Sequence, residues 1–323
     1  MILSIQYLRA FAALTVVWLH AVYGVPGASE HLGAPFFGGS GVDVFFVISG
    51  FIMVAITARD GVSAGRFLLL RIVRVVPLYW LATLVAVTYG SYSADEFVKS
   101  CLFAPYAATG PQSIAPIVPN GWTLNYEMFF YVLFAASLMA PKSLRVPGLV
   151  ALLALLVMAG RLFGPFSYKV FSVYTSPLLL EFAGGMIVAQ AWLKRAAPRS
   201  WPLALIALGL GLYSLGASHS RVVIMGGSFL VVAAATHPRF VSLSNRPLLE
   251  LGNASYSIYL SHPFVMDGLD WITSRMRWNA AQGAPYLHLA VTLISCLVLG
   301  TLCYRFVERP LITRLREVSH SKD

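Results

Sequence analysis

Charged residues are scarce in this chain. They make up 11% of its 323 residues, whereas hydrophobic residues make up 58%. A soluble globular domain is roughly half apolar and about a quarter charged. The composition therefore excludes an ordinary soluble protein and indicates one that lies in a membrane.

Cysteine is also rare. The chain has three, Cys101, Cys296 and Cys303, and their spacing fits neither a disulfide framework nor a metal-binding motif. We therefore expect no metal site. Low-complexity linkers and a soluble appendage are missing as well. We predict a single membrane domain over residues 1–323, in which 312–323 form a short cytoplasmic C-terminal tail.

Long apolar runs, in contrast, are numerous. A helix needs about 20 residues to cross the hydrocarbon core of a membrane. Ten runs approach this length, at residues 5–24, 41–58, 72–89, 122–140, 146–163, 174–192, 201–216, 221–236, 252–271 and 286–306. We predict an all-α polytopic membrane protein with about ten transmembrane helices. The proline-containing stretch 90–121 is predicted to be a long irregular loop, of the kind that often carries function.

Lysine and arginine are distributed unevenly among the segments that connect these runs. One alternating set of connections holds Arg59, Arg66, Arg71, Arg74, Lys142, Arg145, Lys194, Arg195, Arg199, Arg239, Arg246, Arg309, Arg314, Arg316 and Lys322. The other set holds only Lys99, Arg161, Lys169, Arg221, Arg275 and Arg277. Because basic connections stay in the cytoplasm, both termini are predicted to be cytoplasmic. Orientation thus accounts for the net charge of +10, and we expect no nucleic acid partner.

Two ionisable residues interrupt the first apolar run. Arg9 and His20 are eleven residues apart, almost three helical turns, so their side chains share one face about 16 Å apart along the axis. A charged residue at the centre of a membrane helix costs roughly 3 kcal/mol on insertion scales, so such residues point to function.

Three titratable residues are predicted to share one layer near the outer side of the membrane. His20 approaches this layer from the first helix, Asp43 from the second and Glu127 from the fourth. Imidazole suits general base catalysis near neutral pH, and a neighbouring carboxylate orients it. The alternatives are a packed histidine bonded to a carbonyl, an N-cap role for Asp43, and a capping or arginine-pairing role for Glu127.

Arginines on the predicted cytoplasmic side suggest an anion site. Arg71 and Arg74 are three residues apart, so they lie on one face of a helix. Guanidinium groups bind phosphate oxygens in pairs, so these two, with Arg9, are candidates for a phosphate clamp. The alternative is positive-inside charge that contacts lipid headgroups.

Two further segments place polar residues within apolar runs. Ser49 and Gly50 lie in the second run, where they allow either a close helix approach or a break that lines a cavity. His262 lies in the ninth run directly before Pro263, beside a carbonyl that the proline leaves free. It is either a member of the site or a structural partner of a kink.

These residues occur in the order of a known set of motifs. The chain resembles the acyltransferase-3 family of integral membrane acyltransferases over residues 4–311, and is most similar to its bacterial exopolysaccharide (succinoglycan-type) acetyltransferases. The motifs are Arg9 with His20, Gly41 to Phe51, Arg71 with Arg74 and then Pro77 to Trp80, Trp122 with Leu124, Glu127, Phe129 and Tyr131, Gly252 to Pro263, and Phe306 to Pro310. Ser261 departs from the pattern, since relatives often have a large aromatic or apolar residue there.

The resemblance implies a transfer reaction at the bacterial inner membrane. The donor would be acetyl-CoA or another acyl-CoA, bound as a substrate, with no permanently bound cofactor. The acceptor would be a hydroxyl of an exopolysaccharide, another cell-surface glycan or a lipid-linked oligosaccharide, and membrane lipids would surround the protein. In this scheme His20, Asp43 and Glu127 are catalytic and Arg9, Arg71 and Arg74 bind the donor, with Ser49 and His262 as possible additional residues.

Two other function classes compete with this interpretation. A proton-coupled secondary transporter of a small solute would use the acid–histidine layer as a proton relay, but it predicts internal repeats, and we see none. A lipid-acylating membrane enzyme of another family would share the buried histidine without these motifs.

The predicted orientation can be tested with reporter fusions. A reporter at Ser321 should report the cytoplasm and one near Gln112 the exterior, because the basic connections lie on the side of the termini. Alkaline phosphatase and green fluorescent protein activities at each position check the two assignments. An external Ser321 or a cytoplasmic Gln112 would contradict the topology.

Overall fold

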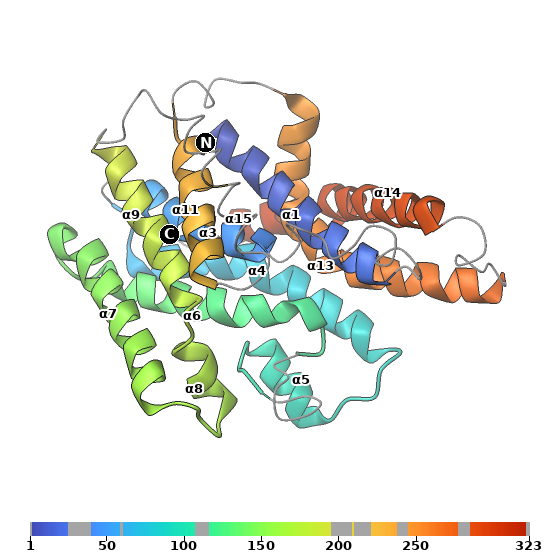
Figure 1. Cartoon of the computed structure of the whole chain (residues 1–323), viewed down its shortest axis with the longest axis horizontal. Helices are drawn as coiled ribbons and strands as arrows, with labels where there is room; N and C mark the ends of the chain where they lie inside the picture. Colours follow the sequence, from blue (N-terminus) through green and yellow to red (C-terminus); the bar gives the residue numbers. More distant parts are fainter. Residues whose placement is uncertain are drawn as a thin grey trace. The chain divides into compact units, whose positions relative to one another are not determined.

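The protein is helical throughout the part of the chain that the structure describes. The computed structural model describes residues 2–24, 40–58, 61–106, 116–194, 209, 221–237, 245–276 and 285–320, and these contain helices and turns but no strand (Figure 1). The longer elements are α1 (Leu3–Gly24), α3 (Ser40–Thr57), α4 (Ala64–Val87), α6 (Trp122–Ser137), α7 (Lys142–Phe163), α9 (Leu179–Leu193), α11 (Arg221–Ala235), α13 (Arg246–Arg275), α14 (Pro285–Cys303) and α15 (Arg309–His320). The shorter ones are α5 (Ala94–Cys101), α8 (Lys169–Tyr174), a 3-10 turn at Pro119–Gly121 and a π-helical turn at Tyr304–Glu308. The prediction of an all-α protein is confirmed.

The described helices agree with the predicted membrane spans. All but one of the ten predicted spans coincide with a helix, and the exception, 201–216, lies outside the described residues apart from Gly209. Six helical stretches are long and apolar enough to cross a membrane, namely Leu3–Gly24, Ser40–Thr57, Ala64–Val87, Lys142–Phe163, Lys169–Leu193 and Tyr286–Glu317. The chain is therefore a polytopic membrane protein, while the total of about ten spans and the orientation stay predictions.

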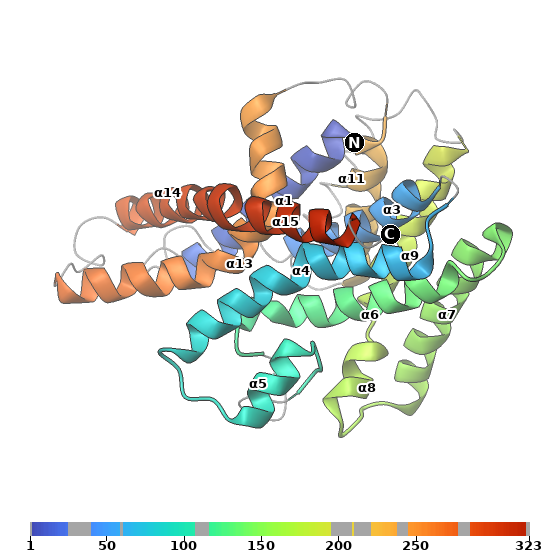
Figure 2. The ribbon, with the colours of Figure 1, turned by 180° about the vertical axis from the view of Figure 1, so that it is seen from behind.

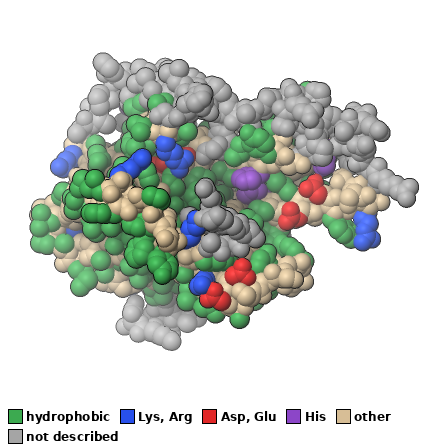
Figure 3. Space-filling model, turned by 60° about the horizontal axis from the view of Figure 1, so that its bottom comes forward, with side chains coloured by type: hydrophobic (Ala, Val, Ile, Leu, Met, Phe, Trp, Pro, Cys, Tyr) green, Lys and Arg blue, Asp and Glu red, His purple; other side chains and the backbone are tan. Residues whose placement is uncertain are grey.

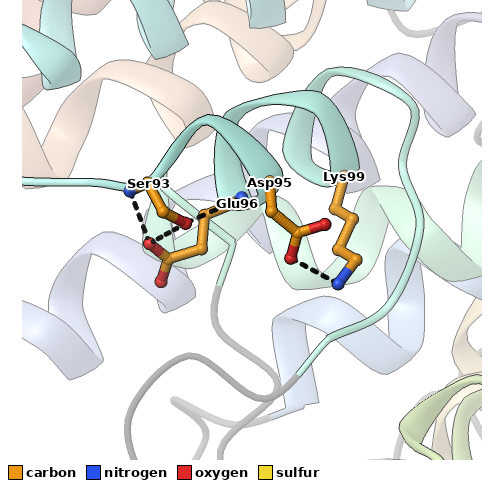
Figure 4. A network of polar contacts seen from close by, with 4 residues as sticks. All are labelled: Ser93, Asp95, Glu96 and Lys99. Atoms are coloured by element: carbon orange, nitrogen blue, oxygen red, sulfur yellow. Dashed lines mark hydrogen bonds and ion pairs between the residues drawn. The ribbon is translucent and has the colours of Figure 1, made fainter.

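The stretch 90–121 is less irregular than predicted. Residues 94–101 form α5, because the hydroxyl of Ser93 accepts a hydrogen bond from the Glu96 amide (3.2 Å) and the Glu96 carboxylate accepts one from the Ser93 amide (2.8 Å). Figure 4 shows this capping box, with the Lys99–Asp95 ion pair one turn later. A serine followed three residues later by glutamate is a sequence signal for a helix start, so this helix was predictable.

The capping box depends on pH in a defined direction. The backbone and side-chain hydrogen bonds from Ser93 lower the pKa of Glu96. A carboxyl group whose pKa is lowered by folding stabilises the folded state above its ordinary pKa. This contribution is lost as the pH falls through the lowered value.

The internal contacts divide the chain into two compact units. The first contains Met1–Phe45 and Ala197–Arg309, and the second contains Phe46–Ala196 and Pro310–Asp323. Helix α3 begins in the first unit and continues in the second. Each unit is described by itself, and the single domain over residues 1–323 stays a prediction.

In the first unit, α13 packs against α1 and α14, and the three lie together in both views (Figures 1 and 2). A side chain at Gly252 would overlap the carbonyl oxygen of Gln6, so glycine allows the backbones of α13 and α1 to approach closely. Ala13 and Ala254 are fully buried in the same cluster. Small residues thus bring α1 and α13 together, and these are the helices that carry two candidate histidines.

In the second unit, α3 and α9 approach each other through two glycines. A side chain at Gly50 would overlap the carbonyl oxygen of Phe182, and one at Gly185 would overlap that of Val47. Helix α3 continues unbroken through Ser49 and Gly50. Of the two alternatives for this segment, close helix approach is the one that the structure has.

Large apolar side chains point away from the protein on several helices. On α7 they include Leu144, Leu152, Leu155, Met158, Leu162 and Phe163. Hydrophobic side chains also cover much of the described surface in the space-filling view (Figure 3). Such surfaces are expected where lipid is the solvent of a helix.

Candidate active site

Two histidines meet in the first unit. The ring centroids of His20 on α1 and His262 on α13 are 4.9 Å apart. His262 is fully buried, whereas His20 is exposed. The sequence listed His20 as the base and His262 as a possible additional residue, and the structure brings the two together.

Backbone hydrogen bonds fix which nitrogen of each ring carries the proton. Nδ1 of His20 lies 2.8 Å from the carbonyl oxygen of Val16, and Nδ1 of His262 lies 2.6 Å from that of Tyr259. A carbonyl oxygen only accepts hydrogen bonds, so in both rings Nδ1 is the donor. In each neutral ring, Nε2 then carries a free lone pair. A general base needs such a lone pair to accept a proton.

Proline explains the local geometry at His262. Pro263 has no amide hydrogen, so the carbonyl four residues earlier, that of Tyr259, has no helical partner. The His262 side chain takes this place. Its Nε2 atom is buried and makes no hydrogen bond among the described residues. The sequence predicts that His262 is either a member of the site or a structural partner of the kink. The hydrogen bond of Nδ1 makes it a partner of the kink, and its Nε2 atom remains available.

Asp43 is held by an arginine that the sequence did not single out. It is buried in the first turn of α3, which begins at Ser40, so it is not the N-cap residue. Nη1 of Arg221, the first residue of α11, lies 3.4 Å from Oδ1 of Asp43, an ion pair without hydrogen-bond geometry. The contact that orients Asp43 is therefore with Arg221, and its predicted action on His20 stays a prediction.

Glu127 belongs to the second unit and has two hydroxyl partners there. Its Oε1 atom accepts a short hydrogen bond from Tyr131, one turn later on α6, and a 3.4 Å hydrogen bond from Ser49 on α3. Because α6 begins at Trp122, Glu127 lies inside the helix and does not cap it. The structure thus joins two predicted site residues, Ser49 and Glu127, directly, and it adds the hydroxyl of Tyr131, a residue of the same sequence motif as Glu127. The shared layer of Glu127 with His20 stays a prediction.

Arginines gather beside this group in the second unit. The Tyr131 hydroxyl lies within electrostatic reach of both Glu127 and Arg71. The guanidinium carbon of Arg71 lies 5.9 Å from the ring centroid of Phe67, and its Nε atom is buried without a hydrogen-bond partner among the described residues. An arginine with unused donors in a partly buried position is suited to bind an anion.

The C-terminal helix adds a further arginine. Arg316 on α15 lies within electrostatic reach of Arg71 and Arg74. The sequence predicts a tail at residues 312–323. In that prediction Arg316 is only one of the basic residues that set the orientation of the chain in the membrane. Helical periodicity does not predict that Arg316 lies close to the arginines of α4, which begins at Ala64.

Arg9, the remaining predicted donor-binding residue, lies in the first unit. It is half-buried, and its Nη1 atom donates a 3.3 Å hydrogen bond to Oε1 of Gln6. Gln6 is one turn earlier on α1 and is buried. A role for Arg9 beside the other arginines stays a prediction.

The last sequence motif forms a polar cluster of its own. Ser257 on α13 donates a 2.5 Å hydrogen bond to Oε2 of Glu308, and both residues are buried. Glu250 on α13 also forms an ion pair with Arg305, three residues before Glu308. These contacts join α13 to the π-helical turn that follows α14, so the motif positions the helix that carries His262.

Comparison with known proteins gives a consistent assignment. The model of the acyltransferase domain family matches residues 2–305. The chain is 37% identical over 310 residues to the exopolysaccharide production protein ExoZ of Rhizobium meliloti, over 90% of this chain and 94% of that protein. No solved structure matches the chain. An integral membrane protein with this helical fold and family match is a membrane acyltransferase, and the chain belongs to the acyltransferase domain family.

Two more distant relatives are named as O-acetyltransferases. The chain is 24% identical to the O-acetyltransferase OatA of Staphylococcus aureus and 26% identical to the putative peptidoglycan O-acetyltransferase YrhL of Bacillus subtilis. These matches cover 94% and 95% of this chain but 56% and 54% of those proteins. The chain thus spans about half the length of these two relatives, and the predicted family and enzyme class are confirmed.

The histidine pair predicts a graded loss of activity. His20→Ala should lower acyl transfer by about 10²–10⁴-fold, the usual contribution of a general base. His262→Asn keeps a side-chain donor for the Tyr259 carbonyl but removes the Nε2 lone pair, so it should lower the rate about ten-fold, the worth of one hydrogen bond. Turnover is measured at matched protein levels in membranes.

His237, a half-buried histidine that follows α11, provides the control. His237→Ala should retain the wild-type rate. Wild-type turnover in His20→Ala would mean that its imidazole is only structural, and His262 would then become the candidate base.

Proposed function

We propose that this membrane acyltransferase transfers an acetyl group from acetyl-CoA to a hydroxyl group of an exopolysaccharide, another cell-surface glycan or a lipid-linked oligosaccharide. The observation that carries the proposal is the exposed His20 ring, whose Nε2 lone pair is available beside His262. The relative named for exopolysaccharide production supports a glycan acceptor, and those named as O-acetyltransferases support transfer to oxygen.

The proposed reaction is direct attack on the thioester. Nε2 of His20 takes the proton from the acceptor hydroxyl as its oxygen bonds to the thioester carbonyl carbon. The carbon–sulfur bond then breaks, and the coenzyme A sulfur leaves with the electron pair and takes the proton back from the His20 imidazolium. The products are the acetyl ester and free coenzyme A, and His20 returns to its neutral state.

A covalent variant uses the same atoms. Nε2 of His20 would itself bond to the thioester carbonyl carbon while the carbon–sulfur bond breaks and the coenzyme A thiolate leaves. The acceptor oxygen would then take the acetyl group as its bond to Nε2 breaks, and the hydroxyl proton would go to the coenzyme A thiolate. Both variants need the Nε2 lone pair. In both, the unpaired Nε2 of His262 is available to accept a hydrogen bond from His20 when that ring is protonated.

The donor's phosphates are assigned to the second unit. Coenzyme A carries several negative charges, and Arg71 and Arg74 offer planar guanidinium groups that bind phosphate oxygens in pairs. The unused Nε donor of Arg71 supports this assignment. In this proposal the arginines face the cytoplasm, where acetyl-CoA is made, and the protein lies in the inner membrane of a bacterium with both termini cytoplasmic.

The competing transporter interpretation has no such support. A proton-coupled transporter also uses intramembrane acids and histidines. The match of residues 2–305 to an acyltransferase family and the enzyme names of the relatives favour group transfer. An acyltransferase also requires a site for a polyanionic donor, which a transporter of a small solute does not.

The proposed donor site predicts a selective kinetic effect. Arg71→Ala or Arg74→Ala should raise the KM for acetyl-CoA by about ten- to a hundred-fold, since one charge-assisted hydrogen bond is worth roughly 1.5–3 kcal/mol. The KM for the acceptor should not change. Lysine at either position should restore the KM only in part, because it lacks the planar fork. The measurement is the release of free coenzyme A thiol by purified protein supplied with glycan.

Lys142→Ala is the matched control, since Lys142 is a cation at the start of α7 outside the arginine group. It should leave both KM values unchanged. An unchanged acetyl-CoA KM in both arginine variants would rule out the clamp. Failure of the wild-type protein to release thiol from acetyl-CoA would contradict the proposed donor.

A further inference from the structure

Two opposite charges on neighbouring helices of the second unit do not form an ion pair. Arg71 on α4 and Glu127 on α6 are both partly buried, and α4 packs against α6. The Nε atom of Arg71 has no hydrogen-bond partner among the described residues, and Glu127 accepts hydrogen bonds from hydroxyl groups instead. A guanidinium near a carboxylate commonly forms a two-pronged ion pair with it, so the separation of these two groups needs a physical cause.

Two buried aromatic rings connect Arg71 to Glu127. The guanidinium carbon of Arg71 lies 5.9 Å from the ring centroid of Phe67, one turn earlier on α4. The centroid of the Phe67 ring lies 6.4 Å from that of the Tyr131 ring, in an edge-to-face arrangement, and both rings are buried. An aromatic face attracts a cation, and close packing restricts the conformations of both rings. The guanidinium is therefore held on the α4 side of the Tyr131 ring.

Hydroxyl groups take the place of the arginine at the carboxylate. Tyr131 donates a short hydrogen bond to Oε1 of Glu127, and Ser49 on α3 donates a second one at 3.4 Å. Hydrogen bonds to an ionised group are roughly twice as strong as those between neutral groups. The Tyr131 hydroxyl also lies within electrostatic reach of Arg71. Its removal would leave a partly buried carboxylate short of a donor, with Arg71 as an alternative partner.

We propose that Tyr131 is a positioning residue of the donor site, because its hydroxyl keeps Glu127 from pairing with Arg71. The inference rests on the proposed function, in which Arg71 binds a phosphate group of the acyl-CoA donor. An arginine that is paired with a carboxylate has to leave it before it can bind the donor, so the apparent affinity falls with the fraction of protein that is unpaired. Hydroxyl groups satisfy Glu127 and leave the guanidinium available to the anion.

The test measures the binding of CoA to the purified full-length protein by calorimetry. Tyr131→Phe keeps the ring against Phe67 and removes the hydroxyl, so it should raise the Kd about ten-fold as Arg71 pairs with Glu127. The double variant Tyr131→Phe, Glu127→Gln should return the Kd to within about two-fold of the wild-type value, because a neutral amide competes weakly for the arginine. This rescue distinguishes positioning from direct contact between the Tyr131 hydroxyl and the donor.

Tyr174→Phe is the matched control. Tyr174 also packs on α6, with its ring centroid 4.0 Å from that of Phe129, but among the described residues the hydroxyl donors to Glu127 are Tyr131 and Ser49. This variant should bind CoA as the wild type does. Normal CoA binding by Tyr131→Phe, or no rescue by Glu127→Gln, would overturn the inference. Weaker binding by Arg71→Ala would in that case still support the proposed donor site.

Thermal unfolding tests the inference without a donor. Arg71→Gln and Glu127→Gln each change the melting temperature, and the two changes should be close to additive in the wild-type background, where the groups do not pair. In the Tyr131→Phe background they should depart from additivity, because the pair has formed. That result would support the inference even if acetyl-CoA were not the donor. Equal additivity in both backgrounds would overturn it.

Discussion

The site depends on one constraint, which is that a polar group inside an apolar helix bundle must find its hydrogen-bond partner within the protein. Pro263 leaves the Tyr259 carbonyl without a helical partner, and the Nδ1 donor of His262 fills the place. His20 meets the same need with the Val16 carbonyl. Because Nδ1 is used in this way, the reactive lone pair of each ring is on Nε2. A structural requirement thus sets the chemical state of the proposed base.

The same constraint explains why the second unit is suited to bind an anion. Glu127 has hydroxyl partners in Tyr131 and Ser49, whereas the buried Nε of Arg71 has no hydrogen-bond partner among the described residues. A carboxylate that is already hydrogen-bonded does not require a ligand, but a partly buried guanidinium with an unused donor does. The chemistry proposed for the first unit and the phosphate binding proposed for the second thus follow from how polar groups are paired.

Sequence reasoning found the helices and many of the candidate residues, because apolar runs and intramembrane ionisable groups are local signals. It also identified the free carbonyl beside His262 from Pro263. It missed the roles of Arg221 and Arg316, because each lies near residues that are distant in sequence and on another helix. Helical periodicity shows which face a residue occupies but not which helix that face meets. The helix α5 was different, since its capping signal was present and was overlooked.

The central claim is that the neutral form of His20 carries its proton on Nδ1 and its lone pair on Nε2. The most direct measurement is ¹⁵N NMR of protein labelled at histidine, with the His20→Ala variant used to assign the signal. The account predicts that the neutral ring of His20 has its proton on Nδ1 and its lone pair on Nε2. A proton on Nε2, with the lone pair on Nδ1, would contradict the bond to Val16 and remove His20 as the base.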